Sequence, residues 1–322
     1  LTGRGHAGYS AYHLLTILPG TTPVDPQQDF AEAARISRRI GSQAGEAWVY
    51  WSWGILEIVQ GRYGQAVEVI QRSREIATQI GHREWIVGSL CILAELYLAL
   101  LAPEDVSRQL HPALTLAREL QSWVWIRQAT GALAAAYCLL DDTVEAQRLL
   151  DQVLSAETPM DATSKRYCWA RRAELALCQG NPVLTLDIVK RLIASAHGMA
   201  PGRVISFLWK LKGEAMAALG DTEAAVCLLQ AALNNARLTG ERSLLWRIHA
   251  SLGWVYNDMG LHPEAESEFA NARGLIYDLA RTVPDVELRN NFIRTATERL
   301  NVLPHAQDDR AVFRKTARRD WS

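Results

Sequence analysis

The chain is poor in the residues and charge patterns that mark several common protein classes. Its 322 residues include 11 prolines and 21 glycines, which is few for an all-β chain, because turns between strands use both residue types. The 34 Lys and Arg residues nearly balance the 35 Asp and Glu residues. Nucleic-acid-binding domains use a basic excess to neutralise phosphates. We therefore expect no nucleic-acid partner.

Cysteine is scarce and irregularly placed. Cys91, Cys138, Cys168, Cys178 and Cys227 form no CxxC motif, and an odd number does not fit a complete disulfide framework. All five lie in apolar stretches, where free cysteine behaves as a small hydrophobic residue. We expect reduced thiols and a cytoplasmic location.

Long apolar segments are also missing. The longest run, residues 90–102, is interrupted by Glu95 and is too short to span a bilayer, so we expect no membrane contact. Residues 1–6 lack the charged segment and apolar core that mark a secretory signal. The sequence also begins without Met, which suggests a piece of a longer protein.

The strongest pattern in the sequence is a repeat of about 40 residues. A small residue recurs at intervals of 40, 40, 39, 40 and 40, at Gly54, Ala94, Ala134, Ala173, Gly213 and Gly253. Seven residues later a turn position recurs, at Gly61, Leu101, Asp141, Gly180, Gly220 and Gly260. Twelve residues after the small residue comes a position in a second helix, at Ala66, Val106, Ala146, Thr185, Ala225 and Ala265. This spacing predicts helical hairpins that bury their faces by stacking.

The last copy carries the clearest version of the pattern, with Leu252-Gly253, Tyr256, Gly260, Ala265, Phe269 and Ala272. It resembles the tetratricopeptide repeat, and the resemblance covers about residues 7–281. The period exceeds the roughly 34 residues of the standard repeat. Longer units of this kind are similar to the helical-repeat regions of large bacterial regulators, among them the maltose-operon activator family and the signal-transduction ATPases.

This resemblance implies an all-α fold, a right-handed α-α superhelix, or solenoid, of helical hairpins. We expect a degenerate first hairpin in residues 1–42 and six hairpins in residues 43–281. A capping helix is predicted in residues 282–300 and a mobile tail in residues 301–322. The capping helix has apolar residues on a charged background, at Val286, Leu288, Phe292 and Leu300.

In stacked hairpins of this kind, the first helices line a concave face that binds the partner. An apolar groove there would suit a helix or hydrophobic segment of a protein or peptide partner, or of an adjacent domain of the same parent chain. A small-molecule effector is an alternative occupant. By analogy with the family, the candidate partner-binding residues are Trp48, Trp51, Ile55, Glu95, Tyr167, Glu174, Phe207, Lys210, Glu214, Trp254, Asn257 and Asp258.

One set of carboxylates offers an alternative chemistry. Asp141, Asp142 and Glu145 have the spacing of the magnesium-binding motif of terpene cyclases, which are all-helical enzymes. Asp141, however, occupies the turn position of the repeat. Asp142 is then a natural N-cap, and Glu145 would complete a capping box. We favour the capping interpretation. With no HExxH or G-x-S-x-G motif in the sequence, we expect no metal, no cofactor and no catalysis.

The sequence therefore predicts a non-catalytic binding domain. The resemblance implies the sensor or interaction region of a larger bacterial signalling or transcriptional regulator, with an NTPase switch and an output domain outside this chain. Two alternatives remain open. One is an all-helical metal-dependent enzyme that uses Asp141, Asp142 and Glu145, and the other is a structural scaffold that only oligomerises.

Overall fold

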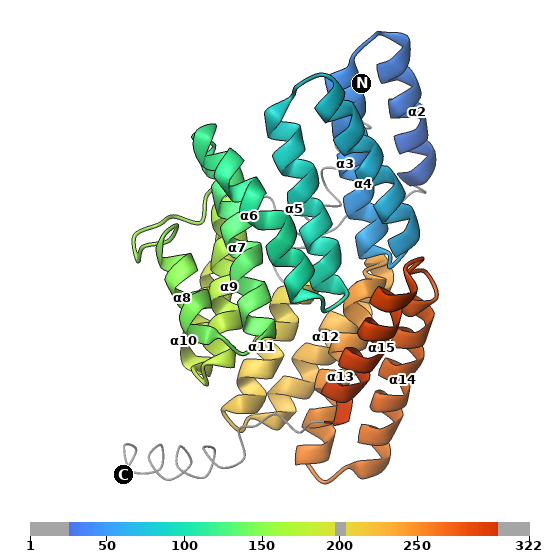
Figure 1. Cartoon of the computed structure of the whole chain (residues 1–322). Coiled ribbons are helices and arrows are strands. Elements are labelled where there is room, and N and C mark those ends of the chain that lie inside the picture. The colour runs from blue at the N-terminus through green and yellow to red at the C-terminus, as the bar shows by residue number, and fades with distance from the viewer. Residues whose placement is uncertain (1–25, 197–203, 302–322) are drawn as a thin grey trace.

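The computed structural model describes residues 26–196 and 204–301, which form fourteen helices and no strand (Figure 1). Consecutive helices pack as hairpins, so the predicted all-α superhelix of helical hairpins is confirmed. None of the described helices is both long and apolar enough to cross a membrane. The helices are α2 (Pro26–Arg39), α3 (Gln43–Val59), α4 (Tyr63–Gln79), α5 (Arg83–Ala99), α6 (Pro103–Glu119), α7 (Trp123–Leu139), α8 (Thr143–Asp151), α9 (Thr163–Cys178), α10 (Pro182–Ala194), α11 (Ser206–Ala218), α12 (Thr222–Thr239), α13 (Arg242–Asp258), α14 (His262–Ala280) and α15 (Val286–Asn301).

Small residues set how closely the two helices of a hairpin approach. A Cβ atom added to Gly213 in α11 would lie 2.7 Å from Leu229 Cγ in α12. One added to Gly253 in α13 would lie 2.6 Å from Phe269 Cε1 in α14. Neither distance leaves room for a side chain, because well-packed interiors have few voids to absorb one. The recurring small residue is therefore the contact point between the first and second helices of a hairpin.

The turn position of the repeat has the same backbone conformation in every copy. All six residues have a positive φ, including the non-glycine residues Leu101 at 55° and Asp141 at 59°. The N–H group of the next residue then donates back to the first helix, as Ala102 does to the Tyr97 carbonyl at 2.9 Å. This is the Schellman arrangement that ends many helices. It explains why glycine dominates the position, since a left-handed backbone costs other residues free energy.

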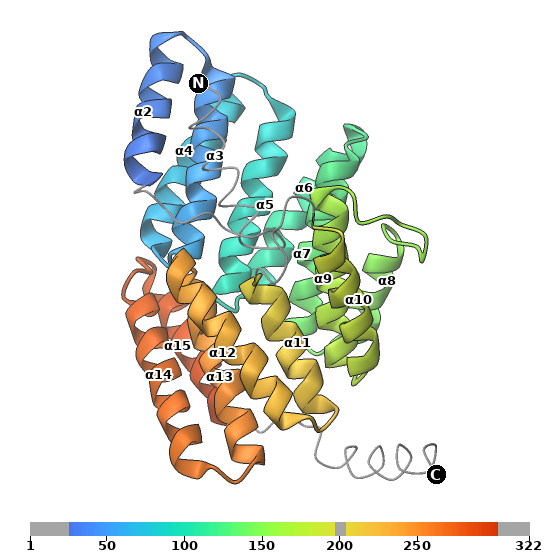
Figure 2. The same ribbon diagram turned by 180° about the vertical axis from the view of Figure 1, so that it is seen from behind.

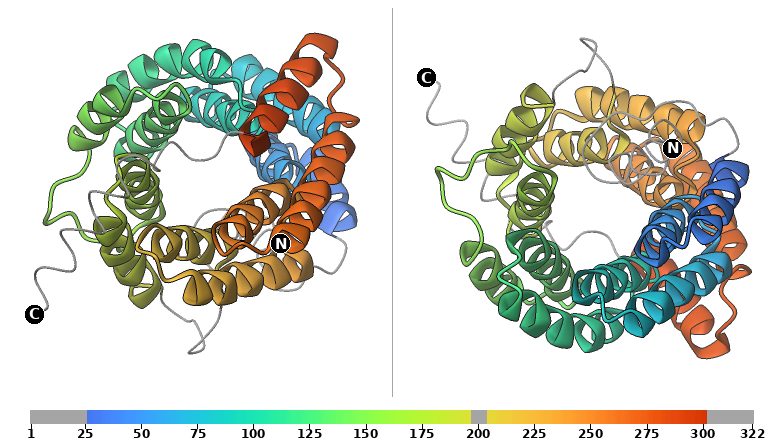
Figure 3. Two further views of the ribbon diagram at one scale, coloured as in Figure 1. Left: turned by 90° about the horizontal axis from the view of Figure 1, so that it is seen from below. Right: turned by 90° about the horizontal axis from the view of Figure 1, so that it is seen from above.

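The first helices form a continuous inner layer. Each of α3, α5, α7, α9, α11 and α13 contacts the next, and α13 also contacts α3. Figure 3 shows these helices on the inside and the second helices on the outside. In Figures 1 and 2 the first hairpins lie directly above the last one. The hairpins thus complete one superhelical turn, and the top of the last hairpin meets the bottom of the first ones.

We call the contact between α3–α5 and α13–α15 the seam. At its centre, Thr282 Oγ1 lies 2.9 Å from the Gly61 carbonyl and accepts the Tyr63 N–H at 3.2 Å. A Cβ atom on Gly61 would overlap Leu279 of α14. The backbone of the first hairpin therefore lies directly against the last hairpin.

Two arginines extend the seam along the lower ends of the next inner helices. Arg247 of α13 donates to the Leu98 carbonyl near the end of α5, at 3.2 Å. Arg299 of α15 donates to the Leu139 carbonyl at the end of α7, also at 3.2 Å. The C-terminal end of a helix carries a partial negative charge, which favours a cation there. Helix ends of three consecutive hairpins thus receive donors from the C-terminal part of the chain.

Helix α15 buries two of its four predicted apolar residues, Phe292 and Leu300. Phe292 is fully buried between Tyr63 and Trp246, with ring centroids 6.5 Å and 6.4 Å away. Leu300 is also buried, whereas Val286 is 58% exposed. The helix therefore stabilises the closure of the turn as well as covering α14.

Candidate binding site on the inner face

A buried charge network joins three consecutive inner helices. Arg171 of α9 forms ion pairs with Glu95 of α5 at 3.1 Å and with Glu174 at 2.7 Å. The Tyr167 hydroxyl also donates to Glu95, and Gln128 of α7 lies 3.5 Å from the same carboxylate. Burial disfavours the charged form of Arg171, but the neighbouring Tyr167, Glu174 and Glu95 outweigh it and raise its pKa. The network therefore holds Arg171 in its charged form.

A second polar group lies between α11 and α13. Lys210 forms an ion pair with Glu214 one helical turn later, at 2.6 Å. The Ser251 hydroxyl of α13 donates to the same carboxylate at 2.6 Å. Five of the predicted partner-binding residues are thus already paired within the inner layer: Glu95, Tyr167, Glu174, Lys210 and Glu214. A partner would have to contact them as paired groups or displace these bonds.

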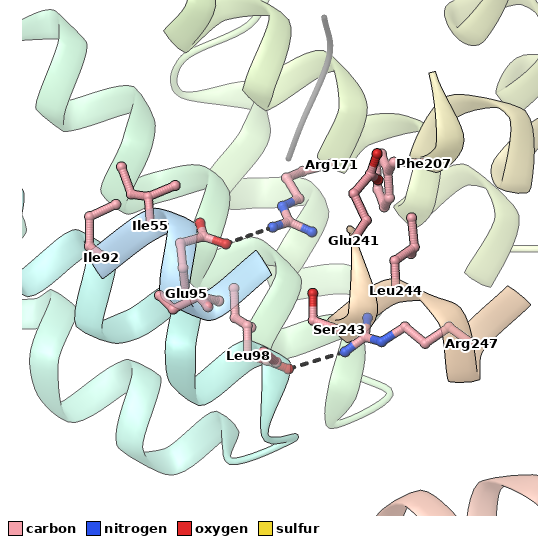
Figure 4. Close-up of a pocket in the computed structure, with 12 residues that line it drawn as sticks. Ile55, Ile92, Glu95, Leu98, Arg171, Phe207, Glu241, Ser243, Leu244 and Arg247 are labelled. Carbon is pink, nitrogen blue, oxygen red and sulfur yellow. Dashed lines mark hydrogen bonds and ion pairs between the residues drawn. The ribbon is translucent and has the colours of Figure 1, made fainter. Parts of the chain in front are cut away.

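The inner face also contains a cavity of about 110 Å³ next to the seam (Figure 4). Aliphatic side chains of α3 and α5 form one side, including Ile55, Ile58 and Ile92. Phe207 of α11 and Arg171 of α9 line it as well, together with the beginning of α13. The cavity is thus lined by five inner helices from both ends of the chain. It exists in this form only while the superhelical turn is closed.

Two charged residues at the beginning of α13, Glu241 and Arg247, line the cavity without a partner of opposite charge in the described part of the chain. Among the described residues, neither Arg247 nor Glu241 forms an ion pair with an oppositely charged side chain. Burial lowers the pKa of the Arg247 guanidinium from its ordinary value, and the nearby Glu174 opposes this effect. Burial raises the pKa of the Glu241 carboxyl, which accepts hydrogen bonds from the hydroxyls of Thr239 and Ser206.

The structure places the predicted partner-binding residues in different environments. Ile55, Glu95 and Phe207 line the cavity. Trp51 is only 4% exposed, and its indole N–H donates to the Gly88 carbonyl at 3.0 Å. Its ring packs on Trp85 and Trp125, at centroid distances of 5.8 Å and 6.1 Å. Trp51 therefore stabilises the packing of three consecutive inner helices.

The remaining predicted aromatic and polar residues lie away from the cavity lining. Trp48 and Trp254 are half-buried against the core. Asn257 and Asp258 lie at the end of α13, where the Asn257 side chain is 3.3 Å from His262. The structure therefore does not bring all predicted positions into one site.

The sequence analysis did not indicate Arg171 or Glu241 as part of the site. Arg247 occupies the same repeat position as Phe207, 40 residues earlier in the chain, so the repeat register places it on the inner face. Glu241 precedes α13 as its N-cap residue. No periodic signal marks this residue, because its place in the cavity depends on how the first and last hairpins meet.

The carboxylates that offered an alternative metal site serve other purposes. Asp142 Oδ1 accepts the Glu145 N–H at 3.0 Å, so its predicted N-cap role is confirmed. The predicted capping box is wrong in its second half. Glu145 pairs with Arg148, and the Asp142 N–H donates to the Tyr137 carbonyl at 2.9 Å because the Schellman turn requires it. Within residues 26–196 and 204–301, no group of three His, Cys, Asp or Glu side chains is arranged to hold a metal.

Comparisons with known proteins show the fold. No family model and no curated protein matches the sequence. The chain is similar to NprR in complex with its cognate peptide NprX, with a TM-score of 0.57 and 11% identity over 93% of this chain and 88% of that chain. A chain of the APC/C hetero-tetramer Cut9–Hcn1 has a TM-score of 0.52 and 11% identity over 84% of this chain and 46% of that chain. BtubC from P. vanneervenii has a TM-score of 0.46 and 13% identity over 74% and 92%. The first two likenesses show that the described residues have a TPR-like helical-repeat fold.

Proposed function

We propose that this chain is a non-catalytic binding domain whose site is the inner face of the closed superhelical turn. In this proposal it is the sensor or interaction region of a larger bacterial signalling or transcriptional regulator. The observation that carries the proposal is the cavity beside the seam. Ile55 of the first full hairpin and Arg247 of the last line the same cavity. An occupant therefore contacts hairpins that are distant in sequence, and its binding favours the closed turn over an open one.

The seam is the contact that opens or closes the superhelical turn, and binding in the cavity would favour the closed state. Helices α3 and α13 share a smaller contact than the two helices of a hairpin do. The seam therefore depends on a few hydrogen bonds and on the packing of Phe292. An occupant of the cavity adds contacts across this joint. A change in closure would move the first and last hairpins relative to each other, which is how a ligand can bias an attached domain.

The likeness to NprR supports a peptide ligand, because that protein is in complex with its cognate peptide NprX. In this chain the inner face combines an aliphatic floor with paired charges, among them Arg171 with Glu95 and Lys210 with Glu214. Such a lining suits a peptide segment or a small polar molecule with an apolar part.

Site-specific photocrosslinking in the full-length parent protein tests this proposal. The photoreactive amino acid p-benzoylphenylalanine would replace Phe207, which lines the cavity, or Tyr277, which is 48% exposed on the outer helix α14. Both positions are aromatic in the native chain, so each variant replaces a ring with a larger ring. After irradiation in the host cell, mass spectrometry would identify covalent adducts.

We expect an adduct with a peptide, protein segment or small molecule at position 207 and none of the same identity at position 277. Equal labelling at both positions would contradict the inner-face site, as would labelling confined to position 277. Circular dichroism of both variants would verify that the helical fold is retained.

A further inference from the structure

Two cysteine thiols meet at the C-terminal ends of two neighbouring inner helices. Cys138 is the last residue but one of α7, and Cys178 is the last residue of α9. These first helices pack against each other and belong to consecutive hairpins, so their C-terminal ends lie at the same end of the inner layer. The Cys138 thiol donates a hydrogen bond to the Cys178 sulfur, and neither cysteine is in a disulfide. The two residues are 40 positions apart, so no short cysteine motif indicates the pair.

Cys178 is the more reactive thiol of the two. It is exposed, whereas Cys138 is half-buried. The hydrogen bond from Cys138 lowers the pKa of the Cys178 thiol from its ordinary value, and Lys210 of α11 acts in the same direction. Partial desolvation and the carboxylates of Glu174 and Glu214 oppose this effect. Because the thiolate is the nucleophilic form of cysteine, Cys178 is the residue that would attack an oxidant first.

The other three cysteines do not share this arrangement. Cys91 and Cys168 are fully buried, and burial raises the pKa of both thiols. Cys227 is exposed on the outer helix α12, away from the inner layer. It is therefore an internal reference for a solvent-accessible cysteine without a neighbouring thiol.

The thiol pair lies where the outer layer of the superhelix is weakest. Helix α8 has 9 residues, whereas α4 and α6 have 17 each, and residues 152–162 after it form no helix (Figure 1). Helix α8 shares a smaller contact with α9 than the other second helices share with the first helix that follows them. In contrast, α7 and α9 share the largest contact of any two consecutive inner helices. The hairpins α7–α8 and α9–α10 are thus joined mainly through α7 and α9.

We propose that Cys138 and Cys178 form a reversible oxidation site, at which a peroxide converts the two thiols to a disulfide that links α7 to α9. The new bond would cross the joint between two hairpins whose outer helices contact each other least. Oxidation would therefore stiffen the middle of the superhelix. Neither cysteine lines the cavity beside the seam, so this site goes beyond the proposed binding function and does not depend on a ligand.

The reaction consumes one peroxide for each disulfide. The Cys178 thiolate attacks one peroxide oxygen, the O–O bond breaks, and the released hydroxide takes up a proton to become water. This step leaves a sulfenic acid on Cys178. The Cys138 sulfur then attacks the Cys178 sulfur, the S–O bond breaks, and the thiol proton leaves with the hydroxide as a second water. Two electrons pass from the sulfurs to the peroxide.

Peptide mapping of the full chain after treatment with hydrogen peroxide tests the proposal. The reduced protein would receive one equivalent of peroxide, free thiols would be alkylated, and tryptic peptides would be analysed without reductant. We expect a linked pair of peptides that contain Cys138 and Cys178, which dithiothreitol separates. The link should form at least about tenfold faster than Cys227 loses its thiol, since the rate follows the thiolate fraction. Loss of the Cys227 thiol at an equal or higher rate would overturn the proposal.

Serine variants separate the roles of the two thiols. Cys138→Ser retains a hydroxyl that can donate to Cys178, so Cys178 should still be oxidised and its sulfenic acid should react with dimedone, with no internal link. Cys178→Ser should leave Cys138 reduced at the same peroxide dose. Cys227→Ser is the matched control and should form the Cys138–Cys178 link at the wild-type rate. Oxidation of Cys138 in Cys178→Ser as fast as in the wild type would contradict the assigned order of attack.

Hydrogen exchange tests the effect of the bond on the joint. Amides of α8 should exchange at least about tenfold more slowly in the oxidised than in the reduced chain, because a disulfide limits the opened states. Amides of α4, in another hairpin, should exchange equally in both states. Equal exchange in α8 with the disulfide present would overturn the stiffening of the joint. Circular dichroism of each variant would verify that the helical fold is retained.

Discussion

The hydroxyl oxygen of Thr282 lies 2.9 Å from the carbonyl oxygen of Gly61, although the two residues are 221 positions apart in the chain. The same oxygen accepts the N–H group of Tyr63 at 3.2 Å. One side chain near the start of the capping region thus contacts both sides of the turn between α3 and α4. Repeat proteins are usually stabilised by contacts between neighbouring repeats alone. Here the first and last hairpins are neighbours as well.

Replacing Thr282 with Val should weaken the seam while preserving the shape of the side chain. The Tyr63 N–H would lose its acceptor, and the carbonyls of Gly61 and Leu279 would lose the hydroxyl donor that they share. An unpaired buried polar group costs about 1–3 kcal/mol. Urea unfolding should show this loss. Thr297→Val is the control, since that hydroxyl bonds only to carbonyls of its own helix, Ile293 and Arg294. An equal cost in both variants would contradict a specific role of Thr282 in closure.

Alanine at Gly61 should be more damaging than alanine at Gly260. Both glycines end the first helix of a hairpin with a positive φ, 68° and 78° respectively, so both substitutions carry a backbone cost of about 1–2 kcal/mol. At Gly61 the added methyl group also overlaps Leu279 across the seam, whereas at Gly260 it meets nothing within 4 Å. The difference between the two free energies of unfolding measures the packing at the seam. Equal values would show that the seam is open in solution.

The capping role of Asp142 predicts a stability effect that does not depend on metal. Asp142→Ala removes the acceptor for the Glu145 N–H and should cost about 1 kcal/mol. Thermal unfolding with and without magnesium should give the same difference between wild type and variant. A stabilisation of the wild type by magnesium that disappears in Asp142→Ala would instead support the metal-dependent alternative.

Glu241 should make stability depend on pH in the acidic range. Burial raises its pKa in the folded chain above the unfolded value of 4.5, so the unfolded chain releases this proton at a lower pH. The contribution of the carboxyl to stability is therefore full below about pH 4.5 and is lost as pH rises through the folded pKa. Glu241→Gln should remove this loss and be more stable than wild type at neutral pH. Urea unfolding between pH 4 and pH 7 would measure the difference, and a wild type that gains stability relative to the variant over this range would contradict it.

The fold could be predicted from the sequence because it repeats in local steps. The spacing of the small residues, such as Gly213 and Gly253, reports helix packing within each hairpin. Leu101 and Asp141 occupy the turn position in place of glycine. The repeat register nevertheless predicts the position of every residue with a left-handed backbone between a first and a second helix. These features depend on residues fewer than about 40 positions apart, which a periodic pattern can reveal.

The seam and the complete site could not be predicted in the same way. Contacts such as Thr282 with Gly61 and Arg247 with Leu98 follow from a small rotation accumulated over six hairpins. No single repeat contains that information. Trp51, which its place on a first helix predicts to be a partner contact, has a packing role that the repeat register does not reveal. In the structure it packs against Trp85 and Trp125, which occur 40 residues apart at one repeat position.

The central claim is that the superhelical turn is closed at the seam, because the proposed site exists only in that state. Double electron–electron resonance tests it with spin labels at Glu68 in α4 and Asp278 in α14, both exposed. The exposed Cys178 and Cys227 would first be replaced by serine. We predict one short, narrow distance distribution that Thr282→Val broadens. A broad distribution dominated by long distances in the otherwise native chain would show an open superhelix and contradict the proposed site.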